Sequence, residues 1–319
     1  MTSDIFLLVL GLLLIVRGAD RLVDGASAIA RKLKISEFVI GLTIVGFGTS
    51  CPELVVSMTG AFGGNADISI GNVIGSNIFN TLLILGMTAL VRPVGISTEN
   101  RRRDIPVALL ATFLMFFCGM NKSMLGVGAS DSLSRAEGIV FLLVFLAYIV
   151  YSFKTDSKPA EHHAEAVETS TFKAVVMSLA GLAGLIIGGK WFVDSAVAIA
   201  RNIGVSDKFI AITLLAGGTS LPELAACVAA AAKNKGQLAL GNILGSNVFN
   251  ILLILGASAV VTPLSFADID IVDVVVLLLS IILVWLCSYT FRKNKIDRFE
   301  GVIFILSFIA YYVWLFIKL

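Results

Sequence analysis

Ten long apolar runs divide this chain, and they restrict its possible folds more than any other feature. Most are close to the roughly 20 apolar residues needed to cross a bilayer. Inside a bilayer, every backbone donor and acceptor must be satisfied by the protein itself, so we expect each run to be a membrane-spanning helix. The predicted limits are residues 4–30, 38–64, 70–91, 104–120, 135–153, 171–200, 208–232, 240–261, 271–290 and 299–317.

The small number of charged residues supports a membrane location. Charged residues make up 14% of the chain, whereas soluble domains contain about 25%. We therefore predict an all-α integral membrane protein, multi-pass in the cell (inner) membrane, surrounded by the lipid bilayer and without a soluble catalytic domain. An enzyme is not expected. The net charge of +2 indicates no nucleic-acid partner, and no protein partner is evident.

Two copies of one polar pattern recur at a constant offset. Residues 41–54 and 211–224 both end in Gly-Thr-Ser-x-Pro-Glu-Leu, and residues 71–80 and 241–250 both read Gly-Asn-x-x-Gly-Ser-Asn-x-x-Asn. Each position in the first copy returns 170 residues later. Hydrophobicity can repeat by chance, but polar residues repeated at one offset indicate an internal duplication.

Each copy holds five predicted spans, so the second copy must enter the membrane in the opposite sense. This predicts ten transmembrane helices in two inverted five-helix repeats, at residues 1–153 and 171–319, joined by a polar cytoplasmic linker at residues 154–170. Of the 24 Lys and Arg residues, 16 fall in one set of alternate loops and 5 in the other. The positive-inside rule then places the amino terminus outside.

Two acidic residues lie in the middle of predicted spans. Glu53 and Glu223 each end a duplicated Gly-Thr-Ser-x-Pro-Glu motif, and their spans carry basic residues only near the ends. A charged side chain at bilayer depth is costly and usually functional. An ion pair or a protonated Glu kept for packing is the alternative, but the sequence offers no partner for it. We therefore interpret the two glutamates as an ion site.

The residues before each glutamate favour a broken helix. Pro52 and Pro222 lack a backbone N–H, and the glycines beside them lower helix propensity. A break frees carbonyl oxygens, which in a membrane must line a cavity or bind a ligand, although an ordinary kink is the alternative. The neighbouring hydroxyl groups are those of Thr49, Ser50, Thr219 and Ser220.

The second motif supplies further oxygen atoms. Ser76 and Asn80 are four residues apart and share a helix face, as do Ser246 and Asn250. We interpret these four as ligands, with small-residue packing and interhelical hydrogen bonding as the alternative. The remaining asparagines are expected elsewhere on the helix and receive no firm role; they are Asn72, Asn77, Asn242 and Asn247.

All of these donors are hard oxygen atoms. Calcium takes six to eight such oxygens in flexible geometry, and sodium could use the same atoms. Zinc and copper favour His and Cys ligands, which this pattern does not provide, and magnesium prefers to keep several waters. The expected substrates are thus calcium and sodium ions, and no cofactor is expected.

The paired motifs resemble the two alpha-repeats of the cation/calcium antiporter superfamily, most closely its prokaryotic sodium/calcium exchangers. The resemblance is strongest over residues 23–93 and 193–263. It implies sodium-driven calcium movement by alternating access at a midplane site, with three sodium ions per calcium. It also adds the carbonyls of Gly46 and Ala216 to the ligands. Potassium-dependent relatives carry Asp in the second motif, so Asn at positions 80 and 250 argues against potassium cotransport.

Three other functions compete with this one. A proton/calcium exchanger of the same superfamily stays open, because a membrane carboxylate can carry protons. A cation channel is less favoured, because inverted repeats with broken helices are typical of carriers and no pore-lining ring of charge stands out. An intramembrane hydrolase would need a base near Ser50 or Ser220, yet the two histidines lie in the linker.

Overall fold

A computed structural model describes residues 2–63, 66–126, 130–155, 170–204, 216–266, 269–290 and 294–318, and these residues are mostly helical. The first half contains α1 (Thr2–Leu33), α2 (Glu37–Ile40), η1 (Gly41–Val45), α3 (Gly46–Thr49), α4 (Cys51–Phe62), α5 (Ala66–Ile78), η2 (Phe79–Ile84), α6 (Leu85–Val91), β1 (Val94–Gly95), η3 (Asn100–Asp104), α7 (Ile105–Gly119), α8 (Asn121–Leu125), β2 (Ser132–Leu133) and α9 (Arg135–Thr155). The elements named η are π-helical.

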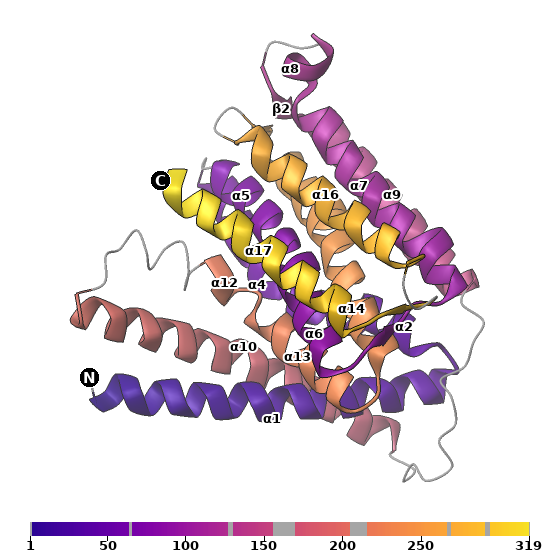
Figure 1. Ribbon diagram of the computed structural model, residues 1–319, viewed down its shortest axis with the longest axis vertical. Coiled ribbons are helices and arrows are strands. Elements are labelled where there is room, and N and C mark those ends of the chain that lie inside the picture. The colour runs from indigo at the N-terminus through magenta and orange to yellow at the C-terminus, as the bar shows by residue number, and fades with distance from the viewer. Residues whose placement is uncertain are drawn as a thin grey trace.

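The second half repeats most of this order, without counterparts of η3 and α8 among its described residues. It contains α10 (Thr171–Asn202), α12 (Ala216–Gly218), α13 (Leu221–Ala232), α14 (Gly236–Val248), η5 (Phe249–Leu255), α15 (Gly256–Val261), β3 (Leu264–Ser265), α16 (Ile271–Cys287), β4 (Lys295–Ile296) and α17 (Arg298–Lys318). Figure 1 shows the helices running between two opposite sides of the molecule, with both chain ends on the same side.

Helices cover most of each of the ten predicted ranges within the described residues, and turns interrupt two of them, at Ser50 and at residues 219–220. Within the described residues, five helical stretches are long and apolar enough to cross a membrane, or six if the bent pair at residues 37–62 is one span. The first part of the predicted seventh span, residues 208–215, lies outside the described residues. Most of the predicted linker does too, although α9 continues to Thr155 and so takes its first two positions. The ten-span count therefore stays a prediction.

Two short antiparallel ladders correct the expectation of a purely helical chain. β1 pairs with β4, and β2 pairs with β3. Each ladder joins the segment after the third span of one half to the segment before the fifth span of the other half. Ten spans would put each pair of segments on one membrane side and the two ladders on opposite sides. The pairing therefore supports the inverted-repeat topology.

The two long helices α1 and α10 pack against each other along their length (Figure 1). Glycine makes this approach possible, because a Cβ added at Gly11 would lie 2.7 Å from the carbonyl oxygen of Gly188, and one added at Gly18 would lie 2.7 Å from that of Gly181. The contacts run in opposite chain directions, so the pair is antiparallel. Small residues at such spacing are typical of close helix packing in membranes.

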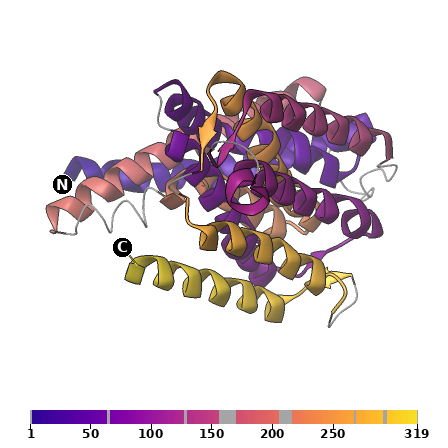
Figure 2. The same ribbon diagram turned by 90° about the horizontal axis from the view of Figure 1, so that it is seen from above.

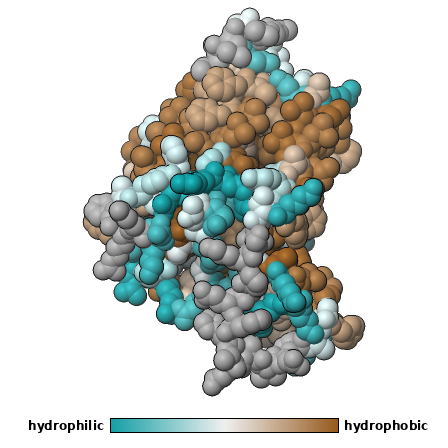
Figure 3. All heavy atoms as spheres, turned by 90° about the vertical axis from the view of Figure 1, so that its right-hand side faces the viewer, coloured by the Kyte–Doolittle hydropathy of each residue, from teal (hydrophilic) through white to brown (hydrophobic). Residues whose placement is uncertain are grey.

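One side of the molecule is polar. The carboxyl-terminal ends of α1 and α9 both point to this side (Figure 1). Figure 3 shows hydrophilic residues gathered across it, with hydrophobic surface on either side of them. The exposed surface of the long helices is apolar; on α9, for example, Leu143 is 60% and Leu146 is 59% exposed. This distribution fits helices that cross a bilayer and carry their polar segments at its boundary.

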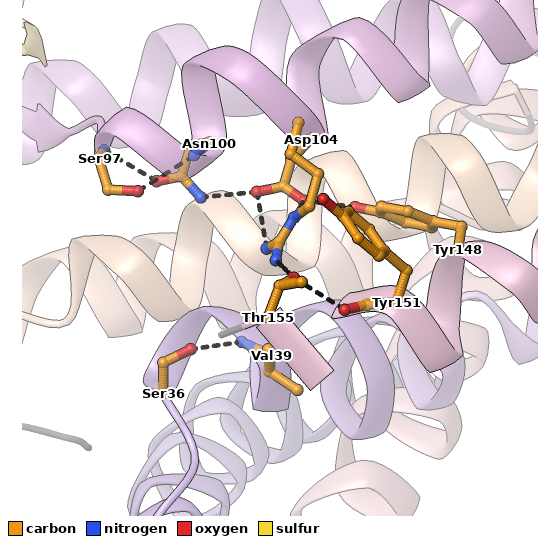
Figure 4. A network of polar contacts seen from close by, with 9 residues as sticks. Ser36, Val39, Ser97, Asn100, Asp104, Tyr148, Tyr151 and Thr155 are labelled. Carbon is orange, nitrogen blue, oxygen red and sulfur yellow. Dashed lines mark hydrogen bonds and ion pairs between the residues drawn. The ribbon is translucent and has the colours of Figure 1, made fainter. Parts of the chain in front are cut away.

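A buried carboxylate joins η3 to α9 near this polar side (Figure 4). Asp104 is 0% exposed and pairs with Arg103 at 2.7 Å. It also accepts hydrogen bonds from Asn100 at 3.1 Å and from the Tyr148 hydroxyl at 2.9 Å. A second Asp–Tyr pair occurs in the other half, where the Tyr311 hydroxyl of α17 donates to Asp273 of α16 at 2.8 Å. Each pair joins the fourth helical segment of a half to the fifth.

Candidate cation site

The helix that carries Glu53 is interrupted directly before it. The helical segments at residues 37–49 and 51–62 meet at an angle of 50°. Ser50 stands at the junction with φ −83° and ψ 7°, outside the helical region. Pro52 removes the N–H that would have continued the helix across this point. The break predicted from the Gly-Thr-Ser-x-Pro-Glu motif is therefore confirmed in the first half.

The second copy of the motif is broken at the equivalent residue. α12 ends at Gly218 and α13 begins at Leu221, and Ser220 has φ −90° and ψ 6°. Pro222 is again in the first turn of the following helix. Each glutamate consequently lies in the first turn of a helix, where free N–H groups and the helix dipole favour negative charge.

Each glutamate is buried and receives a hydrogen bond from the opposite half of the chain. Glu53 is 0% exposed and Glu223 is 1% exposed. The Ser220 hydroxyl donates to Oε1 of Glu53 at 3.0 Å, and the Ser50 hydroxyl donates to Oε1 of Glu223 at 3.0 Å. The two predicted serines and the two glutamates therefore meet in one place, and neither half could assemble this arrangement alone.

Each glutamate keeps one oxygen without a partner. Within the described residues, Oε2 of Glu53 and Oε2 of Glu223 accept no hydrogen bond, and the ion pairs found there include neither residue. Burying an ionised carboxylate is very costly unless it is paired or bound to a metal. A cation between the two halves would meet this need.

The predicted threonines lie beside the serines. Thr49 is buried, and its hydroxyl oxygen lies 3.0 Å from the carbonyl oxygen of Val45 and 3.1 Å from Oδ1 of Asn242, two acceptors available to its one proton. Thr219 is half-buried and directly precedes Ser220, whose hydroxyl bonds Glu53. Both can add oxygen atoms close to the carboxylates.

The asparagines of the second motif lie in π-helical segments, which occur often at functional sites. Asn80 belongs to η2 and Asn250 to η5, and each is 1% exposed. The amide nitrogen of Asn250 donates to the hydroxyl of Ser76 at 3.1 Å and to Oδ1 of Asn77 at 2.9 Å, which leaves its own Oδ1 free. Neither side-chain polar atom of Asn80 has a partner within the described residues.

The remaining predicted ligands are placed less directly. The Ser76 hydroxyl donates to the carbonyl oxygen of Asn72 at 2.7 Å, and the buried Ser246 hydroxyl lies 3.5 Å from Oδ1 of Asn242. Gly46 faces α14 across the repeat boundary, and its carbonyl accepts the Ser50 N–H at 3.0 Å, so it belongs to the helical ladder. Ala216 opens α12, and its side chain lies outside the described part of the chain.

The asparagines that received no firm role make hydrogen bonds to residues at or near the site. Asn72 donates to the backbone carbonyl of Glu53 at 3.2 Å and to Ser57 at 3.0 Å. The expectation that Asn72 lies on another helix face from Ser76 is wrong, because residues four apart share a face. Asn242 and Ser246 are also four residues apart. This spacing could have shown from the sequence that Asn72 and Asn242 face the same way as the two serines.

A second pair of asparagines links the two halves. The amide of Asn77 donates to the backbone carbonyl of Asn247 at 3.1 Å, and the amide of Asn247 donates to the Thr81 hydroxyl at 2.7 Å. These bonds join α5 and η2 of the first half to α14 of the second half. Their position between the two motif helices is a tertiary contact that no spacing rule predicts.

The chemistry of the site is that of hard oxygen donors. Carboxylate, hydroxyl and amide oxygens surround the two breaks, and no group of three or more His, Cys, Asp or Glu residues occurs in the described ranges. Such a donor set suits Ca²⁺ or Na⁺ better than a transition metal.

Comparison with known proteins gives a consistent assignment. The family model described as sodium/calcium exchanger protein matches residues 3–154 and 173–317. The chain is 41% identical to the putative antiporter CaxA of Alkalimonas amylolytica, over 99% of each chain. It is 33% identical to the sodium/calcium exchanger MaX1 of Methanosarcina acetivorans, again over 99% of each. It is also 37% identical to the inner membrane protein YrbG of Escherichia coli, over 97% of this chain and 94% of that protein.

Comparison with solved structures leads to the same family. A structure of the sodium-calcium exchanger NCX_Mj superposes with a TM-score of 0.84 at 34% sequence identity, covering 97% of both chains. The two matched segments of the family model coincide with the two predicted repeats.

Proposed function

This chain belongs to the sodium/calcium exchanger protein family, a family of multi-pass membrane antiporters that exchange cations for calcium, and we propose that sodium is the ion it exchanges for calcium. The exchange takes place by alternating access at the site between the two halves. One observation carries the proposal, namely the two buried glutamates that are each bonded by the opposite half and each keep a free oxygen.

The donors divide into two sets that suit two kinds of load. The carboxylates of Glu53 and Glu223 bring two negative charges, which one Ca²⁺ would balance. Neutral oxygens lie beside them on Ser50 and Ser220, whose hydroxyls bond the glutamates, and the oxygen of Asn250 has no partner within the described residues. Several Na⁺ ions could share the same atoms, because sodium also prefers hard oxygen ligands. Sodium and calcium would then compete for one site, as an exchanger requires.

A proton/calcium exchanger is the second candidate, because buried carboxylates can also carry protons. Calcium flux into proteoliposomes separates the two. An outward sodium gradient at equal pH should drive calcium uptake, and a proton gradient without sodium should not. Uptake that follows the proton gradient alone would reverse the assignment. A cation channel would instead show calcium flux that no counter-ion gradient can drive uphill.

Potassium should not be needed for exchange. Asn80 and Asn250 are neutral and buried, so the site offers no third carboxylate for a further cation. We expect sodium-driven calcium uptake to be unchanged when choline replaces potassium on both sides of the proteoliposome membrane. A strict requirement for potassium would show that neutral asparagines at these two positions do not prevent potassium cotransport.

The antiparallel pair α1 and α10 is the proposed moving element. Lys233, at the end of the helix that carries Glu223, contacts α1 through Asp20 at 3.1 Å and Asp24 at 3.0 Å. Joining Asp20→Cys to Lys233→Cys with a bifunctional thiol reagent should stop exchange yet preserve ⁴⁵Ca²⁺ binding, because it fixes α1 to the site helix. The background would lack the four native cysteines.

A crosslink within the moving pair is the matched control. A Cβ at Gly184 would lie 3.4 Å from the carbonyl oxygen of Leu14, so Leu14→Cys and Gly184→Cys can be joined by the same reagent. We expect exchange to survive, since α1 and α10 would still move together. Exchange that persists after complete crosslinking of the first pair would refute the proposed motion.

A further inference from the structure

An apolar groove runs between α16 and α17, at one edge of the molecule. Figure 2 shows the two helices side by side there. The groove has a volume of about 390 Å³, and its walls include Val272, Val276, Leu279 and Leu283 of α16 with Ala310 and Trp314 of α17. Its floor includes Leu82 of η2, two residues after the site residue Asn80. The groove therefore connects the membrane-facing surface with a segment that builds the cation site.

The polar side chains along the groove are already satisfied by the protein. The Ser280 hydroxyl donates to the carbonyl oxygen of Leu277 at 2.7 Å, and the Ser307 hydroxyl donates to that of Ile303 at 2.9 Å. The Tyr311 hydroxyl donates to Asp273. The surface of the groove is therefore apolar, and its polar groups need no hydrogen bond from a ligand. Its occupant should be a hydrocarbon.

The shape of the groove fits one extended chain. Val272 and Leu283 are eleven residues apart on one face of α16, a length of roughly 16 Å at 1.5 Å per residue. The volume accommodates on the order of a dozen methylene groups if each takes about the 30 Å³ share of a liquid water molecule. Exposed apolar side chains border the groove, with Leu306 59% and Ile309 48% exposed, so a chain could enter from the bilayer.

In the part of the chain that the structure describes, charged side chains gather at one end of the groove. The first turn of α16 and the last turn of α17 meet there, where Asp270 pairs with Lys318. Lys318 also lies 5.2 Å from the centre of the Trp314 ring. Asp273 is half-buried beside them, and within the described residues its side chain bonds to Tyr311 alone. Among the described residues, this end therefore has two carboxylates and one ammonium group, which leaves a negative charge for a cationic partner.

The contrast with the first half strengthens this point. Asp104 has the equivalent tyrosine partner, but Arg103 neutralises it and Asn100 adds a further bond. In the second half, Val272 stands directly before Asp273 and supplies no charge. A carboxylate at the end of a membrane span without its own cation is suited to a cation from the lipid headgroup layer.

We propose that this groove binds the acyl chain of a membrane phospholipid whose primary ammonium headgroup contacts Asp273. The chain would pack against Leu82 and so support the π-helical segment that positions Asn80. The lipid would stabilise the protein structure, and it would come from the membrane leaflet on the side where the two ends of the protein lie. The assignment depends on the membrane location of α16 and α17 and not on which ion drives exchange.

Native mass spectrometry of the detergent-purified protein tests the proposal. After delipidation, phosphatidylethanolamine or phosphatidylglycerol with the same acyl chains is added back. We expect one bound phosphatidylethanolamine and weaker binding of phosphatidylglycerol. Ala310→Phe and Ser307→Phe each fill the groove and should lower binding at least tenfold, whereas Ile309→Phe, on the neighbouring exposed surface, should not. Asp273→Asn should keep lipid binding but lose the preference for phosphatidylethanolamine.

Three results would overturn the assignment. Equal phosphatidylethanolamine binding by the wild type and by both groove-filling variants would place the lipid elsewhere. Equal binding of the two lipids by the wild type would remove the role of Asp273, and a protein dimer in place of a lipid adduct would make the groove an interface between copies. Thermal unfolding and size-exclusion profiles of each variant establish that it is folded, so that lost binding reports on the groove.

Discussion

Calcium transport should be abolished when either Glu53 or Glu223 is replaced by glutamine. The substitution keeps the size of the side chain and the hydrogen bond from the serine of the other half, but it removes one of the two charges that a divalent ion needs. Bound Ca²⁺ would then have one positive charge without a carboxylate partner. Leaving a buried charge unpaired costs about 3–5 kcal/mol, which corresponds to a loss of affinity on the order of 100-fold or more. Calcium uptake under a sodium gradient and ⁴⁵Ca²⁺ binding are the measurements.

Glu37→Gln is the matched control. Glu37 is in the first turn of α2, so it belongs to the same membrane segment as Glu53 but stands at its end. The same chemical change there should leave transport close to the wild type. Near-normal uptake by a well-folded Glu53→Gln protein, or an equal loss in Glu37→Gln, would contradict the assignment of the ion site.

The sequence predicted the broken helices because their cause is local. Proline removes a specific N–H, glycine weakens the helix around it, and the duplicated motif puts the same break in both halves. The burial of Glu53 and Glu223 followed from their place in the middle of apolar runs. Local chemistry and hydrophobic pattern thus suffice for the helical fold and for the acidic centre of the site.

Features that depend on contacts between the halves could not be predicted in the same way. The π-helical segments around Asn80 and Asn250 have no distinctive spacing in the sequence. The two short strand ladders involve residues about 130 to 200 positions apart. The two asparagines also differ, since Asn250 is held by Ser76 and Asn77 whereas Asn80 has no partner in the described structure. Identical motifs gave no sign of this asymmetry.

The asymmetry has a consequence for the ions. The amide nitrogen of Asn250 is engaged, which fixes its oxygen in place, whereas both side-chain polar atoms of the buried Asn80 lack a partner within the described residues. A neutral amide adds coordination without adding charge. The charge of the empty site therefore comes from Glu53 and Glu223 alone, and it is −2 when both are ionised.

Membrane potential should shift the calcium gradient that the exchanger maintains. One Ca²⁺ neutralises the two carboxylates, so the calcium-loaded carrier crosses without net charge. We propose that three Na⁺ ions replace it, the third held by neutral oxygens. That load would leave the site at +1, so each exchange cycle would move one net charge. A potential of 100 mV contributes roughly 2.3 kcal/mol per charge, which is about a fifty-fold change in the equilibrium calcium ratio.

The measurement is calcium flux in proteoliposomes at a fixed sodium gradient, with the potential set by potassium and valinomycin. The expected independence from potassium makes this clamp usable, since potassium would otherwise act as a substrate. A calcium ratio that does not change across a 100 mV range would rule out three sodium ions per calcium. It would favour two sodium ions or two protons, because either load balances the charge of the two glutamates and leaves nothing for the potential to act on.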